Sequence, residues 1–116
     1  MRGEPFQREL DCYERLRDHS VLDIRGHRVP RLLAWDHELW VIEMTTVKRP
    51  FLLDFAGAWL DNPPDFADEV VEQWHEEKLH QFGERWPDVQ AVLAILQSRY
   101  GIYLLDIHPG NLTFGG

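Results

Sequence analysis

The chain has 116 residues, 44% of them apolar and 12% aromatic, and its 20 acidic residues against 12 basic ones give a formal net charge of -8. This length predicts one domain over residues 1–116 and excludes a multidomain machine, while the apolar content argues against wholesale disorder. The acidic balance argues against nucleic acid or an anionic membrane as the main partner, because both select basic surfaces.

The first half of the chain predicts a helix, then a pair of strands. Apolar residues recur every three or four positions at Phe6, Leu10, Tyr13 and Leu16. This spacing predicts an amphipathic helix over 5–19. Two apolar runs, 29–35 and 39–44, flank a polar turn at Asp36-His37 and predict a strand pair. Residues 51–60 are predicted to form a short helix.

The second half predicts two longer helices. Asp65 is the expected N-cap of a helix over about 66–82, which would bury Val70, Val71 and Trp74 and stop at Gly83. Residues 61–88 carry -7 of the net charge, with nine acidic residues opposed by two basic ones. This charge is interpreted as a solvated helix face, with an acidic docking surface for a basic partner as the alternative.

A clean helical stripe then precedes a polar loop. Pro87 suits the first turn of a helix over 87–100 that ends at Gly101, and the apolar run 102–105 is too short to form another. The turn-rich loop 106–111 follows, with 112–114 as a possible strand. This order predicts an α+β chain whose helices are mostly C-terminal.

Two residues of this loop can carry chemistry. Asp106 and Asn111 lie five positions apart with a Pro-Gly turn between them, so both can converge on one point. A carboxylate can accept a hydroxyl proton or orient a nucleophile, and an amide oxygen can bind Mg²⁺. Asp106 is therefore the candidate catalytic residue and Asn111 the candidate metal ligand. The alternative is that both only stabilise turns.

The segment Asp106-Ile107-His108-Pro109-Gly110-Asn111 resembles the catalytic loop of the protein kinase-like superfamily. It is most similar to the loops of atypical and small-molecule kinases, such as aminoglycoside phosphotransferases and the ubiquinone-biosynthesis kinase-like family. The resemblance covers about 6–114 and implies a partial protein-kinase-like fold. In that fold, residues 1–45 are a remnant of the N-lobe, with helix C and a small antiparallel sheet, and 46–116 form the helical lobe with the catalytic loop.

The resemblance also implies roles for individual residues. Glu9 lies where the family has its ion-pairing glutamate on helix C, and His108 is expected to fix the loop by hydrogen bonds. The backbone that meets the adenine would run through the gatekeeper and the hinge, at Ile42, Glu43, Met44 and Thr45. If the protein is active, its cofactors are Mg²⁺ and ATP, bound for phosphoryl transfer to a hydroxyl.

Several departures from the family pattern argue against activity. No Gly-rich loop precedes Glu9, no lysine precedes Lys48, and Leu104-Leu105 replaces the His-Arg before the catalytic aspartate. The chain ends before an Asp-Phe-Gly segment, so a kinase domain truncated at both ends is expected. Most of the phosphate positioning and charge stabilisation that kinases use is then missing.

Three functions follow from these features. The first is a pseudokinase that lacks phosphotransferase activity or retains a degenerate form of it, and acts as a binding or scaffold domain. The second is an active ATP-dependent phosphotransferase completed by a partner chain or by a longer native sequence. The third is a small helical interaction module unrelated to kinases.

Partners and compartment are expected from simpler features. The strand at 39–44 would expose an edge, which predicts a homodimer or a protein partner that covers it. His75 and His80 are five residues apart and do not share a helix face, so a zinc site is not expected. The five tryptophans are expected in the core, although so many in a short chain could leave one exposed, and Cys12 is expected to be a small buried hydrophobe. No membrane span or signal-peptide core is visible, which predicts a cytoplasmic protein.

Overall fold

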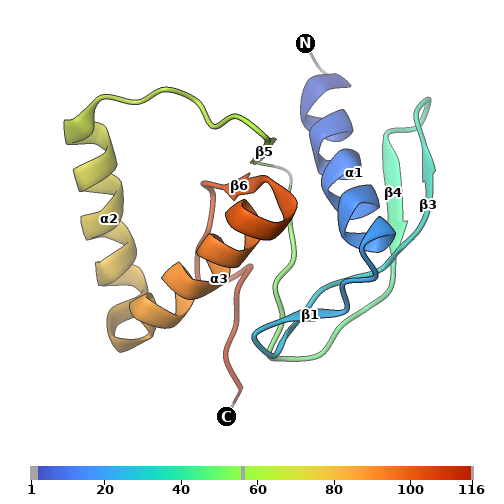
Figure 1. Ribbon diagram of the computed structural model, residues 1–116. Helices are drawn as coiled ribbons and strands as arrows, with labels where there is room; N and C mark the ends of the chain where they lie inside the picture. Colours follow the sequence, from blue (N-terminus) through green and yellow to red (C-terminus); the bar gives the residue numbers. More distant parts are fainter. Residues whose placement is uncertain (1–2, 56, 116) are drawn as a thin grey trace.

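The computed structural model describes residues 3–55 and 57–115 and has the predicted α+β class, with small antiparallel strand pairs beside helices (Figure 1). The elements are, in chain order, α1 (Gly3–Asp18), β1 (Asp23–Ile24), β2 (His27–Arg28), β3 (Leu32–Asp36), β4 (Val41–Met44), β5 (Ala58–Leu60), α2 (Asp68–Phe82), the 3-10 turn η1 (Gly83–Arg85), α3 (Trp86–Tyr100) and β6 (Ile102–Leu104). In the parts of the chain that the structure describes, no helix is both long and apolar enough to cross a membrane.

Helix α1 packs its predicted stripe into the core. Leu10, Tyr13 and Leu16 are buried, and Phe6 packs partly against them. Cys12 is also fully buried, as predicted, and this burial raises the pKa of its thiol to about 12. The thiol therefore stays protonated at neutral pH and is a packing residue rather than a nucleophile.

The strand pair predicted around Asp36 is confirmed. β3 and β4 run antiparallel, and the Asp36 carboxylate accepts hydrogen bonds from the backbone N–H groups of Glu38 and Leu39 in the turn. A second, shorter hairpin of β1 and β2 was not predicted. Its turn residues, Arg25 and Gly26, both have positive φ, as the tight turns of two-residue hairpins require.

The predicted helix over 51–60 is wrong. Phe51 bridges Arg28, Leu52 bridges Leu112, and β5 pairs with β6. Long-range partners satisfy the backbone here, so local helix propensity does not decide the structure. Residue 56 lies outside the described residues. The possible strand at 112–114 is reduced to the single bridge at Leu112.

Helix α2 also differs from its prediction. It begins at Asp68 with Ala67 as its N-cap, and no side chain caps it, so the role given to Asp65 is wrong. Val70 and Val71 are 47% and 40% exposed, because α3 does not cover the first half of α2. The helix buries Phe82 and also Lys78.

The tryptophans differ in how much of each side chain is exposed to solvent. Trp86 is buried and Trp74 is partly buried, but Trp35, Trp40 and Trp59 are exposed. Three are therefore exposed where the sequence pattern allows for one, so the expectation of a mainly buried set is wrong. Trp35 and Trp40 lie on the β3–β4 hairpin and contact Arg17 and Phe6 of α1, which cover each ring only in part.

Helix α3 is the best-predicted element. Pro87 lies in its first turn, and its buried stripe consists of Val89, Val92, Leu93 and Leu96. Gly101 adopts a left-handed conformation at the C-cap, with φ 64°, and its N–H bonds back to the carbonyls of Leu96 and Gln97. The chain then turns directly into β6 and the polar loop.

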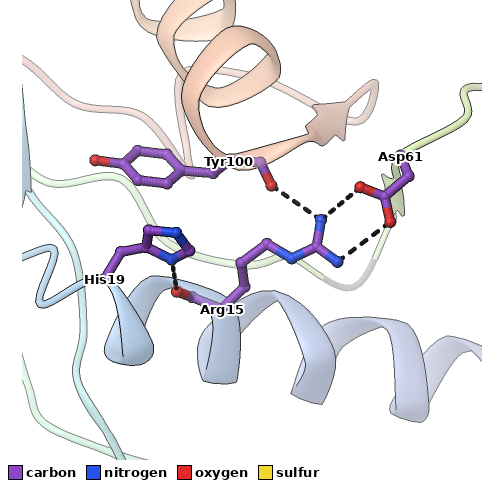
Figure 2. A network of polar contacts seen from close by, with 4 residues as sticks. All are labelled: Arg15, His19, Asp61 and Tyr100. Carbon is purple, nitrogen blue, oxygen red and sulfur yellow. Dashed lines mark hydrogen bonds and ion pairs between the residues drawn. The ribbon is translucent and has the colours of Figure 1, made fainter.

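A polar clamp ties α1 to the C-terminal part of the chain (Figure 2). Both guanidinium ends of Arg15 bond the Asp61 carboxylate, at 2.8 and 3.2 Å, and Nη1 also donates to the carbonyl of Tyr100 at 3.0 Å. A side chain at Gly101 would collide with this pair, since a Cβ there would lie 2.6 Å from the Asp61 carboxylate. The clamp therefore requires glycine at the end of α3.

The clamp makes stability sensitive to acid. Its hydrogen bonds hold the pKa of Asp61 below the ordinary 3.8. The stabilisation is therefore complete above that ordinary value and is lost as the pH falls through the lower pKa of the folded chain. We expect Asp61→Asn to remove this part of the acid sensitivity, and Arg15→Ala to lower the melting temperature further because the bond to Tyr100 is lost too. Thermal unfolding of the three proteins from pH 7 to pH 2 measures both effects. The same dependence of melting temperature on pH in all three proteins would contradict the clamp.

Candidate functional site

The loop after β6 is closed by the side chain of Asn111. Its Nδ2 donates to the carbonyl of Asp106 at 2.7 Å, and its Oδ1 accepts from the N–H of His108 at 2.9 Å. The backbone N–H groups of Asn111 and Leu112 both donate to the carbonyl of His108. Asp106, His108 and Asn111, which the sequence singled out, are therefore brought together in one hydrogen-bonded turn.

Three consecutive carbonyls of this loop are held by side chains. Trp74 Nε1 donates to Leu105 O at 3.0 Å, Asn111 Nδ2 donates to Asp106 O, and Lys78 Nζ donates to Ile107 O. The first and last of these donors come from α2, one helical turn apart. The backbone of Asp106 is thus fixed on both sides and at its own carbonyl, which is the kind of support that positions a functional side chain.

The carboxylate of Asp106 remains on the surface. Asp106 is exposed, whereas Leu105 before it is partly buried and Ile107 after it is buried. Gly57 lies directly against it, and a Cβ at that position would be 2.9 Å from the Cβ of Asp106. Glycine at position 57 therefore leaves the aspartate room to keep its orientation.

The imidazole of His108 folds back over the loop. Its Nδ1 accepts a hydrogen bond from the N–H of Gly110 at 2.9 Å, and a Cβ at Gly110 would lie 2.8 Å from the ring. This bond assigns Nδ1 as the unprotonated nitrogen in the neutral tautomer. His108 acts here as a brace for the Pro-Gly turn.

Glu9 faces a carboxylate instead of a lysine. It lies half-buried on α1, and burial together with the negative charge of Asp54 raises the pKa of its carboxyl group. Asp54 is held nearby, since its N–H donates to the hydroxyl of Tyr13 at 3.2 Å. An ion pair between Glu9 and a lysine, as the kinase resemblance would imply, is not formed by the described residues.

The four candidate nucleotide-binding residues lie apart from the loop. Ile42, Glu43 and Met44 belong to β4, and the N–H of Thr45 donates to the carbonyl of Arg31. The Thr45 hydroxyl also accepts a hydrogen bond from the N–H of Arg31. Both the N–H and the hydroxyl of Thr45 are therefore bonded to Arg31, the residue that precedes β3. Figure 1 draws α1 between the β3–β4 hairpin and β6, and α1 packs against both β3 and β5.

The candidate metal ligand is buried in this conformation. Asn111 is 1% exposed and both ends of its amide are hydrogen-bonded within the loop, so ligation of Mg²⁺ by Asn111 requires the loop to open. The accessible oxygen donor is the carboxylate of Asp106. Among the described residues, no three His, Cys, Asp or Glu side chains gather into a group that could hold a metal ion.

Sequence reasoning missed Lys78 as a site residue. It is 7% exposed, and besides Ile107 O its Nζ bonds Gln81 Oε1 at 3.2 Å. One signal was present, because Trp74, Lys78 and Phe82 recur every four residues and so share one helix face. A lysine in the middle of a buried stripe needs an acceptor, and the loop carbonyl supplies it.

Compared with known proteins, the chain matches no family model, no curated protein and no solved structure at a significant level. The function is therefore argued from the geometry of the loop and its surroundings.

The loop's dependence on Asn111 can be measured. We expect Asn111→Ala to destabilise the fold by about 2–3 kcal/mol, because it removes a buried amide and leaves the partly buried N–H of His108 and carbonyl of Asp106 without this partner. In a chain of this size that corresponds to a drop of roughly 10 °C in melting temperature. Thermal and urea unfolding measure the change.

The chain offers a matched control in its other asparagine. Asn62 is exposed, so Asn62→Ala should melt within about 0.5 kcal/mol of the unaltered protein. Equal stability of the two alanine variants would show that the Asn111 amide does not hold the loop.

Proposed function

We propose that this chain is a kinase-like binding domain, in which the loop at 104–112 presents Asp106 to a magnesium-bound nucleotide without carrying out phosphoryl transfer on its own. The order of the elements supports this proposal. A helix carrying Glu9 is followed by a strand pair, and α3 leads through a short strand into the loop with Asp106 and Asn111. This is the order that the kinase resemblance implies.

One observation carries the proposal. The three carbonyls at 105, 106 and 107 are each held by a side chain, while the Asp106 carboxylate stays exposed. These bonds fix the backbone on both sides of Asp106, which is the only exposed residue among 105–107. Fixed backbone with a free functional group is how binding and catalytic carboxylates are preorganised.

The charges argue against phosphoryl transfer by this chain alone. Such transfer depends on cations that position phosphates and neutralise developing charge. The chain's lysines are Lys48 and Lys78, and Lys78 is buried against Ile107 O. Glu9 has the carboxylate of Asp54 as the charged neighbour that raises its pKa, which is the opposite of a phosphate-positioning ion pair.

The roles of the remaining residues follow from where they lie. Mg²⁺ would meet the carboxylate of Asp106 first, and Asn111 could join as a second oxygen ligand after the loop opens. Bound there, Mg²⁺ would supply charge neutralisation of the phosphates. The backbone from Ile42 to Thr45 would contact the adenine if β4 and the loop share one ligand, with Glu9 and His108 in supporting positions.

A second candidate function is an active phosphotransferase completed by another chain. It is favoured by the partly uncovered β3–β4 hairpin, where Leu39 is 72% exposed and an added strand or partner domain could bind. That partner would have to supply the missing lysine and a metal-binding carboxylate. Asp106 would then accept the proton of the substrate hydroxyl.

Titration of Mg²⁺ and ATP tests the proposal. We expect ATP to bind only with Mg²⁺ and to stabilise the chain by about 1.4 kcal/mol at ten times Kd, a shift of roughly 5 °C in melting temperature. Asp106→Asn should abolish the shift. Asp65→Asn removes an exposed carboxylate away from the loop and should leave it unchanged.

Turnover is measured in the same samples by release of phosphate and by phosphorylation of added hydroxyl compounds. None is expected from this chain alone. A folded protein that binds no nucleotide at millimolar Mg²⁺ and ATP would contradict the proposal. Turnover by the isolated chain would contradict both the absence of transfer and the need for a completing partner.

A further inference from the structure

An apolar groove opens between α2 and α3, where the two helices diverge from η1 (Figure 1). Near η1 the two helices pack closely. The rings of Phe82 and Trp86 stack with their centroids 6.2 Å apart, and Trp74 meets Trp86 edge-on with a centroid distance of 5.7 Å. Further along, the helices leave a space of about 440 Å³ between them. Its apolar lining includes Phe66, Val70, Val71, Trp74, Leu93 and Leu105.

The lining is exposed where it should be buried. Phe66 is 47% exposed, and Val70 and Val71 are exposed to a similar degree, although all three line the space between α2 and α3. Leaving several large apolar side chains together in water is unfavourable and is typical of a surface that binds something. The volume is enough for a few apolar side chains of a partner.

The charge around the groove is almost entirely negative. The exposed side chains of α2 include Asp68, Glu69, Glu72, Glu76 and Glu77. The lysine of this helix, Lys78, is turned inward to Ile107 O and neutralises nothing at the surface. No lysine or arginine lines the groove in the part of the chain that the structure describes.

The helical repeat places acids on both flanks of the apolar strip. At ~100° per residue, Asp68 lies ~60° beyond Val71 on one side of the strip, and Glu77 lies ~20° beyond Val70 on the other. Glu69, Glu72 and Glu76 point away from the groove on the far side of α2. The groove is therefore apolar along its floor and acidic along its edges.

These features select the occupant. A second copy of the chain would bring two acidic α2 helices together in a symmetric contact, which like charges oppose. A helix with one apolar face and lysines or arginines beside it matches both the floor and the edges, as amphipathic helices do in other grooves. We propose that the α2–α3 groove is a docking site for a basic amphipathic helix of a partner protein. This site adjoins the proposed nucleotide loop at Leu105, but the docking proposal does not rest on nucleotide binding.

The probe for this site is a synthetic peptide of about 18 residues with leucines on one helical face and lysines on the other. Fluorescence anisotropy of the labelled peptide measures affinity, and the NMR signal of the Trp74 indole N–H reports binding in the groove. We expect saturable binding that weakens as salt rises, because exposed charges are screened. A peptide of the same composition without an apolar face should bind at least about tenfold more weakly.

Variants of the chain locate the peptide. Val71→Arg fills the groove with a cation and should reduce affinity at least about tenfold. Asp68→Lys with Glu77→Lys, which reverses the charge on both flanks, should do the same. Glu69→Lys with Glu76→Lys makes an identical change in net charge on the far side of α2, and should reduce affinity less than about threefold because of screening.

Several results would overturn the docking site. Equal losses from the two double variants would mean general attraction of a cation to an acidic protein. Unchanged affinity in Val71→Arg, with the protein still folded by circular dichroism, would place the peptide elsewhere. Sedimentation showing a dimer of the unaltered chain that Val71→Arg dissociates would make a second copy the occupant.

Discussion

The structure depends on the hydrogen bonds that hold three consecutive carbonyls in the loop between β6 and Leu112. The hydrogen bond to Ile107 O is buried and those to Leu105 O and Asp106 O are partly buried, so protein donors hold all three carbonyls in place of water. Trp74, Lys78 and Asn111 supply the donors. Two of these come from α2, so the position of the loop and the position of α2 are fixed by the same bonds.

This coupling explains several features that look unrelated. Lys78 is buried because the loop needs its ammonium group, which leaves the outer surface of α2 without a lysine or arginine. Leu105, whose carbonyl Trp74 holds, also lines the α2–α3 groove. A partner in that groove would therefore contact the same helix that braces Asp106. The clamp of Arg15 on Asp61 holds α1 to this assembly from the other side.

The parts of the fold that local pattern decides were predictable from the sequence. Periodicity located α1 and α3, and spacing alone brought Asp106 and Asn111 into one loop. The segment 51–60 could not be predicted, because its backbone pairs with residues far away in the chain. The burial of Lys78 could not be predicted either, since it depends on a carbonyl 29 positions later in the sequence. Spacing also could not reveal that the Asn111 amide is used inside the loop.

Native-state hydrogen exchange of the His108 amide tests the central claim most directly. This N–H donates to the side chain of Asn111, so it can exchange only when the braced loop opens. The account predicts that it exchanges as slowly as the buried amides of α3, and that Lys78→Met speeds it while α3 is unchanged. Exchange as fast as in the exposed residues 65–67 would show that the loop is not held, and would contradict the account.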